Sequence, residues 1–176
     1  MQIPSEMRQW VLASRPNGLA TEQDFRLETV PAPMPGPGEV LERTQYLGVA
    51  PVMLRYMTNS TDFEKELEIG DVMHGRGVGL VGQSNNPRWQ PGDLVYARLR
   101  WREYALFDDD PYYIPMRMAH PDLKWSYGVG TLGNNGFPAL VGMRDIGRLA
   151  PGDRVLVSGA AGGVGSSCAF VAKALG

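Results

Sequence analysis

A glycine-rich stretch near the C-terminal end constrains the fold most. Residues 154–158 read Arg-Val-Leu-Val-Ser, which we expect to be a short strand. Residues 159–165 read Gly-Ala-Ala-Gly-Gly-Val-Gly and precede an apolar helix expected over 166–175. A dinucleotide pyrophosphate requires this succession, because glycines let the backbone approach the phosphates and a helix N-terminus offers N–H groups to the anion. The stretch therefore predicts the first strand, loop and helix of a dinucleotide-binding α/β domain.

Every residue of this loop is a candidate for cofactor binding. The strict fingerprint is G-x-G-x-x-G, whereas the glycines here follow G-x-x-G-x-x-G, and the surrounding strand and helix support the assignment. A tight strand-to-helix connection without a ligand is the alternative. The candidate cofactor-binding residues are Gly159, Ala160, Ala161, Gly162, Gly163, Val164 and Gly165.

The first 130 residues predict a mainly β domain. Turns rich in Pro and Gly separate short apolar runs that we expect to be strands, at 9–13, 25–30, 39–47 and 77–83, and the run 94–107 is expected to be a long strand pair or a bent strand. In the last run, Arg98, Arg100 and Arg102 alternate with apolar residues at the period of a strand, which predicts a buried face and a solvated arginine face. Attraction of an anionic substrate or phosphate is the alternative for the arginines.

Apolar residues return at helical spacing over 133–149, so a second domain is expected to begin near residue 131. A chain of 176 residues has room for one domain and part of another. Its net charge of -2 gives no reason to expect nucleic-acid or membrane partners. Cys168 is the single cysteine, which excludes an intrachain disulfide and a thiolate zinc cluster. With no signal-peptide pattern at the N-terminus, we expect a cytoplasmic protein.

Several stretches together resemble one known family. They include Leu-Gly-Asn-Asn-Gly-Phe at 132–137, Gly-Met-Arg-Asp-Ile-Gly at 142–147, and the Pro-Gly-Asp turn at 151–153 with the glycine loop. Residues 10–18 and the Trp-x-Glu-Tyr pattern at 101–104 extend the similarity to the front. The chain resembles the zinc-independent medium-chain dehydrogenases/reductases that include prostaglandin reductases, alkenal double-bond reductases and bacterial curcumin reductase.

The resemblance implies a GroES-like catalytic domain over 1–130, then a linking helix and the truncated start of a Rossmann domain over 131–176. It implies an oxidoreductase that uses NADPH to reduce the carbon–carbon double bond of enals or enones by hydride transfer, without a metal. A quinone reductase or enoyl reductase of the same fold is one alternative, and a non-catalytic GroES-like binding module is another. His74 stands where zinc-dependent members carry Gly-His-Glu, and we expect it to be a packed or surface histidine.

The resemblance also places substrate between the two domains, near Met53, Trp101 and Asn134. Residues 50–54 read Ala-Pro-Val-Met-Leu where the family often has Asp-Pro-Tyr-Met-Arg, so Tyr56 is the candidate to replace the absent tyrosine. Met53 and Met57 are four residues apart, a spacing that belongs more often to a helix face in the core than to a binding site. No catalytic residue is assigned. The expected partners are a small enal, enone or quinone, and a homodimer is left open.

The chain ends before the position, roughly 20 residues beyond the motif, that distinguishes NAD from NADP. NADPH is therefore implied by the resemblance alone. We expect the isolated chain to fold through its barrel domain, to bind NADPH no more tightly than millimolar, and to catalyse nothing. Its 154–175 segment is expected to be disordered, folded back on the barrel, or buried in a dimer contact, because a lone β-α unit is not stable.

Overall fold

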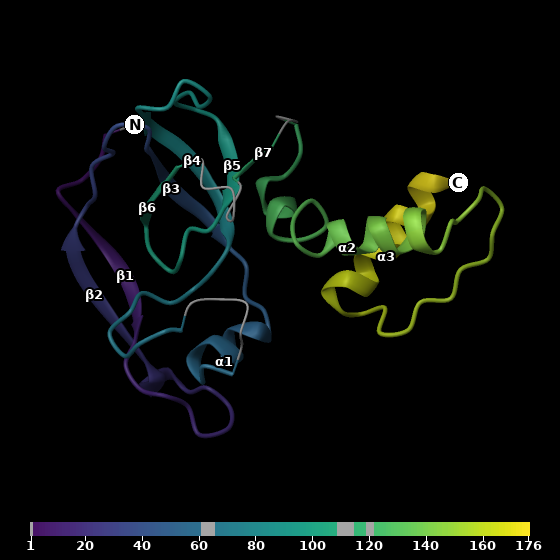
Figure 1. Cartoon of the computed structure of the whole chain (residues 1–176), viewed down its shortest axis with the longest axis horizontal. Coiled ribbons are helices and arrows are strands. Elements are labelled where there is room, and N and C mark those ends of the chain that lie inside the picture. The colour runs from purple at the N-terminus through teal and green to yellow at the C-terminus, as the bar shows by residue number, and fades with distance from the viewer. Residues whose placement is uncertain (1, 61–65, 109–114, 119–121) are drawn as a thin grey trace. The chain divides into compact units, whose positions relative to one another are not determined.

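The structure is a computed structural model that describes residues 2–60, 66–108, 115–118 and 122–176 (Figure 1). The chain divides into two compact units, Met1–Pro121 and Asp122–Gly176. The domain boundary expected near residue 131 stays a prediction. Among the described residues, no helix is long and apolar enough to cross a bilayer.

The first unit consists mainly of antiparallel strands. Strand β1 (Glu6–Leu12) pairs with β2 (Phe25–Pro31) in a two-stranded sheet that brings Trp10 opposite Leu27. A second sheet has the order β6-β3-β4-β5-β7. Its strands are β3 (Val40–Leu47), β4 (Gly77–Ser84), β5 (Leu94–Ala97), β6 (Tyr104–Phe107) and β7 (Met116–Arg117).

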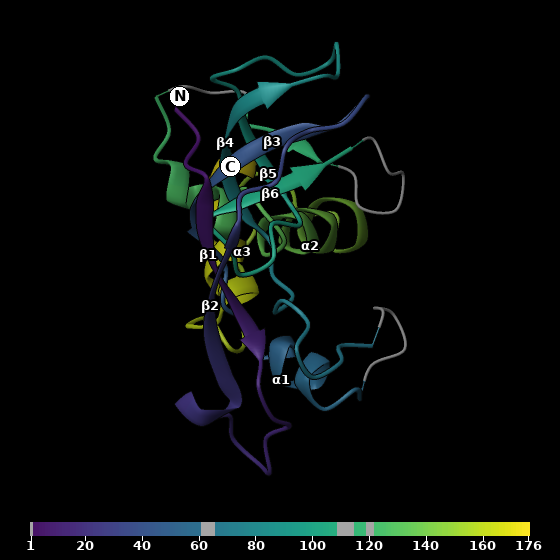
Figure 2. The ribbon, with the colours of Figure 1, turned by 90° about the vertical axis from the view of Figure 1, so that its left-hand side faces the viewer.

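Isolated bridges connect β1 to later segments of the same unit. Gln9 pairs with Arg102 and Val11 pairs with Val72, both antiparallel. Figure 2 shows the β1–β2 ribbon running down the view beside the larger sheet. Short helices also belong to this unit: a single 3₁₀ turn, η1 (Glu22–Asp24), and α1 (Val52–Met57).

The core of the first unit lies in three clusters of buried side chains. One contains Val40, Val81, Trp89, Val95, Ala97, Leu99 and Ala105, a second contains Leu12, Met57, Leu67 and Met73, and a third contains Met7, Leu41 and Tyr104. Alternating apolar residues of the expected strands supply most of these side chains, as the period of a strand requires.

The prediction of a solvated arginine face was wrong. The run 94–107 contains two strands, β5 and β6, and the chain turns between them at Arg100, which has φ of 59°. Arg98, Arg100 and Arg102 are all half-buried and do not form a solvated face. A left-handed residue resets the alternation of sides, so a two-residue period does not carry through it.

The second unit is helical. After a 3₁₀ segment, η2 (Trp125–Val129), helix α2 (Gly136–Leu140) continues as a π-helical turn, η3 (Val141–Ile146), and α3 (Gly163–Leu175) follows. The helix expected over 133–149 is thus present, with shorter bounds. Helix α3 packs on α2, so the expectation that its segment would lack support within its own unit was wrong.

The strand expected at 154–158 does not form. These residues are largely exposed, Leu156 by 99%, and no described residue pairs with them as a neighbouring strand. A strand exists only through hydrogen bonds to a neighbour, so apolar sequence alone does not produce one.

Candidate functional site

Two of the predicted substrate residues meet over Gly75. A Cβ atom at this glycine would lie 2.8 Å from Cδ1 of Trp101 and 3.7 Å from Cε of Met53. Met53 comes from α1 and is 8% exposed, while Trp101 comes from the segment before β6 and is half-buried. The absence of a side chain at Gly75 therefore lets a methionine and an indole converge from distant parts of the chain, forming an apolar wall.

Backbone contacts on both sides hold Trp101 in place. Its N–H donates to the carbonyl of Met73 at 3.0 Å, and its carbonyl accepts from the N–H of Trp10 at 2.8 Å. The indole stacks on Phe25 with ring centroids 5.4 Å apart. Nε1 of this indole is buried and has no hydrogen-bond partner among the described residues. Because this atom has almost no exposed surface, an acceptor oxygen of a ligand can reach it only if the residues that cover it move.

Tyr56, the third substrate candidate, lies beside His74. Their rings meet edge to face with centroids 5.3 Å apart. His74 is 3% exposed, and Nη2 of Arg98 lies 3.0 Å from its Nδ1. His74 is therefore a packed histidine. No group of three or more His, Cys, Asp or Glu side chains within the described ranges could hold a metal ion.

The glycine loop has the backbone geometry that only glycine tolerates at two of its positions. Gly159 adopts φ of 61°, in the left-handed region. A Cβ on Gly165 would lie 2.9 Å from Cα of Ala160 and closer still to the carbonyl oxygen of Gly159, so the loop folds tightly onto the first turn of α3. This is a close backbone approach of the type that a pyrophosphate cradle needs, and these residues fit that part of a dinucleotide.

Asn134 lies exposed in the turn before α2, in the second unit. Its neighbour Asn135 was not singled out from the sequence, yet its side chain lies against the start of α3, where a Cβ on Gly163 would be 2.7 Å from Nδ2. Oγ of Ser167 donates to the carbonyl of Gly163 at 2.8 Å and also contacts Thr131. Polar side chains from before α2 therefore border the helix terminus at which a phosphate would bind.

Glu42, which was not singled out from the sequence, is a buried acid whose charge interacts with that of the half-buried Arg102. Glu42 is completely buried, and burial raises the pKa of its carboxyl well above the ordinary value, an effect that Arg102 opposes. Burial, together with the charge of Arg100, lowers the pKa of Arg102 to about 10, against the effect of Glu42. Nε of Arg102 donates to the carbonyl of Leu99 at 3.1 Å.

The chain resembles known proteins over almost its whole length. A model of the N-terminal domain of oxidoreductases matches residues 8–113. The chain is 36% identical over 169 residues to the NADPH-dependent curcumin reductase of Escherichia coli (strain K12), covering 96% of this chain and 48% of that protein. It is 35% identical over 169 residues to prostaglandin reductase 1 of Oryctolagus cuniculus, covering 96% of this chain and 46% of that protein.

The chain thus spans about half the length of the curated relatives that it matches. Among solved structures, CurA from Vibrio vulnificus superposes with a TM-score of 0.80 at 35% identity, covering 97% of this chain and 49% of that one. The same protein has been solved in complex with NADPH and gives the same TM-score. These matches confirm the expected fold, a GroES-like N-terminal domain that leads into the beginning of an α/β domain.

Proposed function

Because the chain belongs to the zinc-independent medium-chain oxidoreductases, through the N-terminal domain that residues 8–113 form, we propose that the whole protein is an NADPH-dependent reductase of carbon–carbon double bonds in enals or enones. The observation that supports this most is the glycine loop, where Gly159 is left-handed and Gly165 has no room for a side chain. The relatives of the chain include a 2-alkenal reductase of Nicotiana tabacum. We propose enals and enones as substrates because the relatives are named for reductions of this kind.

Residues 159–165 would hold the pyrophosphate of the cofactor. Helix α3 begins at Gly163, and the N–H groups of its first turn have no carbonyl within the helix to donate to. The partial positive charge at this end of the helix favours an anion. Asn135 lies against that terminus, and Oγ1 of Thr131 accepts from Oγ of Ser167 in the same helix at 3.4 Å. NADPH, when bound, supplies the hydride, so the protein's own contribution is binding, orientation and electrostatics.

Met53, Tyr56 and Trp101 would line the substrate side in the first unit, and Asn134 would contribute from the second. The wall over Gly75 is apolar and suits the hydrocarbon part of an enal or enone. The buried N–H of Trp101 is the donor in this wall without a partner among the described residues. Its role would be to orient a carbonyl oxygen whose negative charge grows as hydride arrives.

The proposal also names a partner and a compartment. The partner is a small enal, enone or quinone, with no nucleic acid or membrane, since relatives are named for curcumin, prostaglandin and 2-alkenal reduction. A cytoplasmic location is supported by the single free cysteine, Cys168. A homodimer remains part of the proposal and is tested by the mass of the protein in solution.

The test uses the protein that contains this chain in full. It is assayed with NADPH and a panel of a 2-alkenal, an enone, a quinone and a crotonyl thioester, following the loss of NADPH absorbance. Oxidation of NADPH by the alkenal and enone, well above that with quinone or thioester, is the expected result. Oxidation by quinone or thioester alone assigns one of the alternatives, and none with any substrate supports a binding module.

A matched pair of glycine variants tests the cofactor loop. Gly165→Ala introduces a methyl group that would overlap the Gly159–Ala160 backbone, so KM for NADPH should rise by more than tenfold. Gly142→Ala is the control, because no atom lies within 4 Å of its added Cβ. Equal KM values for NADPH in the two variants would exclude the loop as the pyrophosphate site.

A further inference from the structure

A pocket on the first unit is not part of the site described above, although Trp101 borders both. It has a volume of about 290 Å³ and lies between the β1–β2 ribbon, β3 and the segment before β6. Trp10 and Leu27, which are paired across β1 and β2, are 42% and 45% exposed. The lining residues are Arg8, Trp10, Leu27, Thr44, Leu47, Trp101, Arg102 and Glu103.

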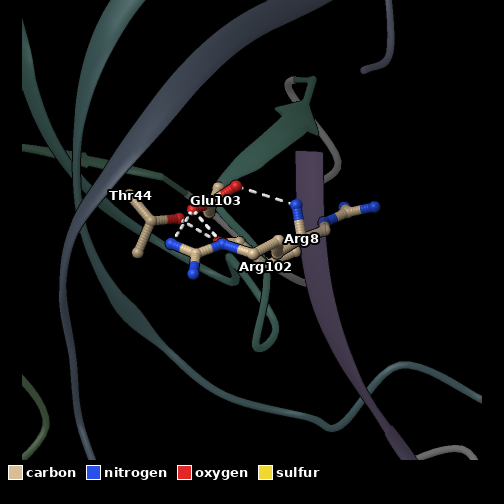
Figure 3. Close-up of polar contacts among 4 residues, drawn as sticks. All are labelled: Arg8, Thr44, Arg102 and Glu103. Carbon is tan, nitrogen blue, oxygen red and sulfur yellow. Dashed lines mark hydrogen bonds and ion pairs between the residues drawn. The ribbon is translucent and has the colours of Figure 1, made fainter. Parts of the chain in front are cut away.

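The polar end of the pocket is a preformed ion pair (Figure 3). Nε and Nη2 of Arg8 donate to Oε1 of Glu103 at 2.9 and 2.6 Å, and the backbone N–H of Arg8 donates to Oε2 at 2.7 Å. The N–H of Glu103 in turn donates to the carbonyl of Arg8 at 3.0 Å. Side chain and backbone therefore fix the guanidinium and the carboxylate relative to each other, without requiring a ligand.

This pair retains both a donor and an acceptor. In the described part of the chain, no contact uses Nη1 of Arg8, and Oε2 of Glu103 accepts from a single N–H. A carboxylate has about four lone-pair sites, so one remains at this end of the pocket. The hydrogen bonds from Arg8 lower the pKa of Glu103, which keeps the acceptor ionised.

Another polar group of the pocket, the hydroxyl of Thr44, already has an acceptor for its proton. Oγ1 of Thr44 donates to the carbonyl of Arg102 at 2.6 Å, so that hydroxyl can only accept from a ligand. The other lining residues are two indoles, two leucines and Arg102, whose Nε donates to the carbonyl of Leu99 at 3.1 Å. Indole faces and edges favour a planar aromatic ring over a flexible chain, because ring contacts add to the burial of apolar area.

We propose that this pocket is a binding site for an uncharged phenolic ring. The ring lies between Trp10 and Trp101, and its hydroxyl accepts from Arg8 and donates to Glu103. An aromatic carboxylate fits less well, since the charge of Arg8 is already neutralised and a second carboxylate would meet Glu103. The site is formed by the first unit alone, so it does not depend on the function proposed above.

The 176-residue chain, labelled with ¹⁵N, is titrated with 4-methylphenol, toluene and 4-methylbenzoate. These probes share size and shape and differ in the polar group. The indole N–H signals of its four tryptophans report the site: Trp10 and Trp101 should shift together to saturation, while Trp89 and Trp125 stay in place. We expect the dissociation constant of 4-methylphenol to be lower than that of toluene or 4-methylbenzoate by a factor of about five or more. A difference of this size is what one additional hydrogen-bonding group contributes.

Two variants separate the apolar walls from the polar pair. Leu27→Asn should weaken the phenol and toluene alike, and its exposed position leaves the fold intact. Arg8→Leu should remove the preference for the phenol over toluene, whereas Arg8→Lys retains a donor and part of that preference. Arg26→Leu is the matched control, because Arg26 is also an exposed β-strand arginine in an ion pair, with Glu28, outside the pocket.

Three results would overturn the proposal. Unsaturable shifts, or equal shifts at Trp125, would mean unspecific association of aromatic probes with the surface. Equal affinities for 4-methylphenol and toluene would show that the Arg8–Glu103 pair does not form hydrogen bonds with the hydroxyl of the phenol. Tightest binding by 4-methylbenzoate would make the pocket an anion site, with Arg8 acting as an unneutralised charge.

Discussion

The carboxyl group of Glu42 lies directly against the backbone of Gly79, where a Cβ atom would be only 2.7 Å from Cδ of the glutamate. Glycine at this position in β4 makes room for a buried acid that extends from β3. Both oxygens of the carboxyl are without a hydrogen-bond partner among the described residues. A buried polar group in this state lowers stability, more strongly when it is charged.

Glu42→Gln should stabilise the protein at neutral pH. Burial raises the pKa of Glu42 above its ordinary value near 4.5, so the folded state holds this proton more tightly than the unfolded state. Stability is therefore greatest below pH 4.5 and declines as pH rises toward the folded pKa. The glutamine cannot ionise, so the variant avoids this decline. Its free energy of unfolding at neutral pH should be higher by roughly 1–3 kcal/mol.

Thermal unfolding at a series of pH values measures this effect. The difference in Tm between Glu42→Gln and the unaltered chain should grow from pH 4 to pH 8, and each kcal/mol corresponds to roughly 2–4 °C for a chain of this size. Near pH 4 the two proteins should unfold together. A constant difference at all pH values would contradict ionisation of Glu42 as the cause.

Asp24→Asn should destabilise the first unit. The carboxylate of Asp24 accepts from the hydroxyl of Ser14 at 2.6 Å and from the N–H of Thr21 at 2.8 Å. These hydrogen bonds lower the pKa of Asp24. A lowered pKa gives stability that is present above the ordinary value near 3.8 and is lost as pH falls through the folded pKa. The variant should lower Tm at neutral pH and lose less stability in acid than the unaltered chain. Glu22→Gln, in the same turn, is the control and should unfold unchanged.

Gly75→Ala should displace the indole of Trp101. The added methyl group would be 2.8 Å from Cδ1, closer than a normal contact, so the ring has to shift or the backbone has to strain. Overpacking of this kind costs roughly 1–3 kcal/mol. A smaller ring relieves the clash, so Trp101→Phe in the same chain should cancel part of the loss. Additive losses in the double variant, measured by denaturant unfolding, would show that the two residues do not meet.

The isolated chain should bind NADPH no more tightly than millimolar. The loop at 159–165 offers pyrophosphate contacts, but residues 154–158 before it are exposed and have no neighbouring strand among the described residues to fix them. Calorimetric titration of the chain with micromolar NADPH should give only the heat of dilution. The same titration of the Gly165→Ala variant should give the same result. A micromolar dissociation constant for the unaltered chain would refute this expectation.

Much of the first unit was predictable because strand periodicity and turn residues are local signals. Expected runs at 25–30, 39–47 and 77–83 match β2, β3 and β4 to within one or two residues at each end. The interruption at Arg100 was not predictable, because nothing in the alternating sequence marks a left-handed residue. The strand expected at 154–158 failed for a related reason, since the hydrogen bonds that define a strand come from another segment.

The candidate site was predictable in its residue types and less so in its contacts. The glycine loop could be assigned because strand, loop and helix are contiguous in sequence, and its two glycine-only positions agree with that assignment. Convergence of Met53 and Trp101 depends on Gly75, a contact that no local pattern encodes. The Arg8–Glu103 pair likewise joins the first strand to a segment far along the chain. The roles of the predicted cofactor and substrate residues stay predictions.

All three clusters of buried apolar side chains lie within residues 1–121, whereas the glycine loop lies in the other compact unit. No residue of the loop belongs to any of these clusters. Substitutions in the loop therefore change a different set of residues from those that build the apolar core of the β-rich unit. Selection can alter the sequence of the loop without replacing a core side chain of that unit.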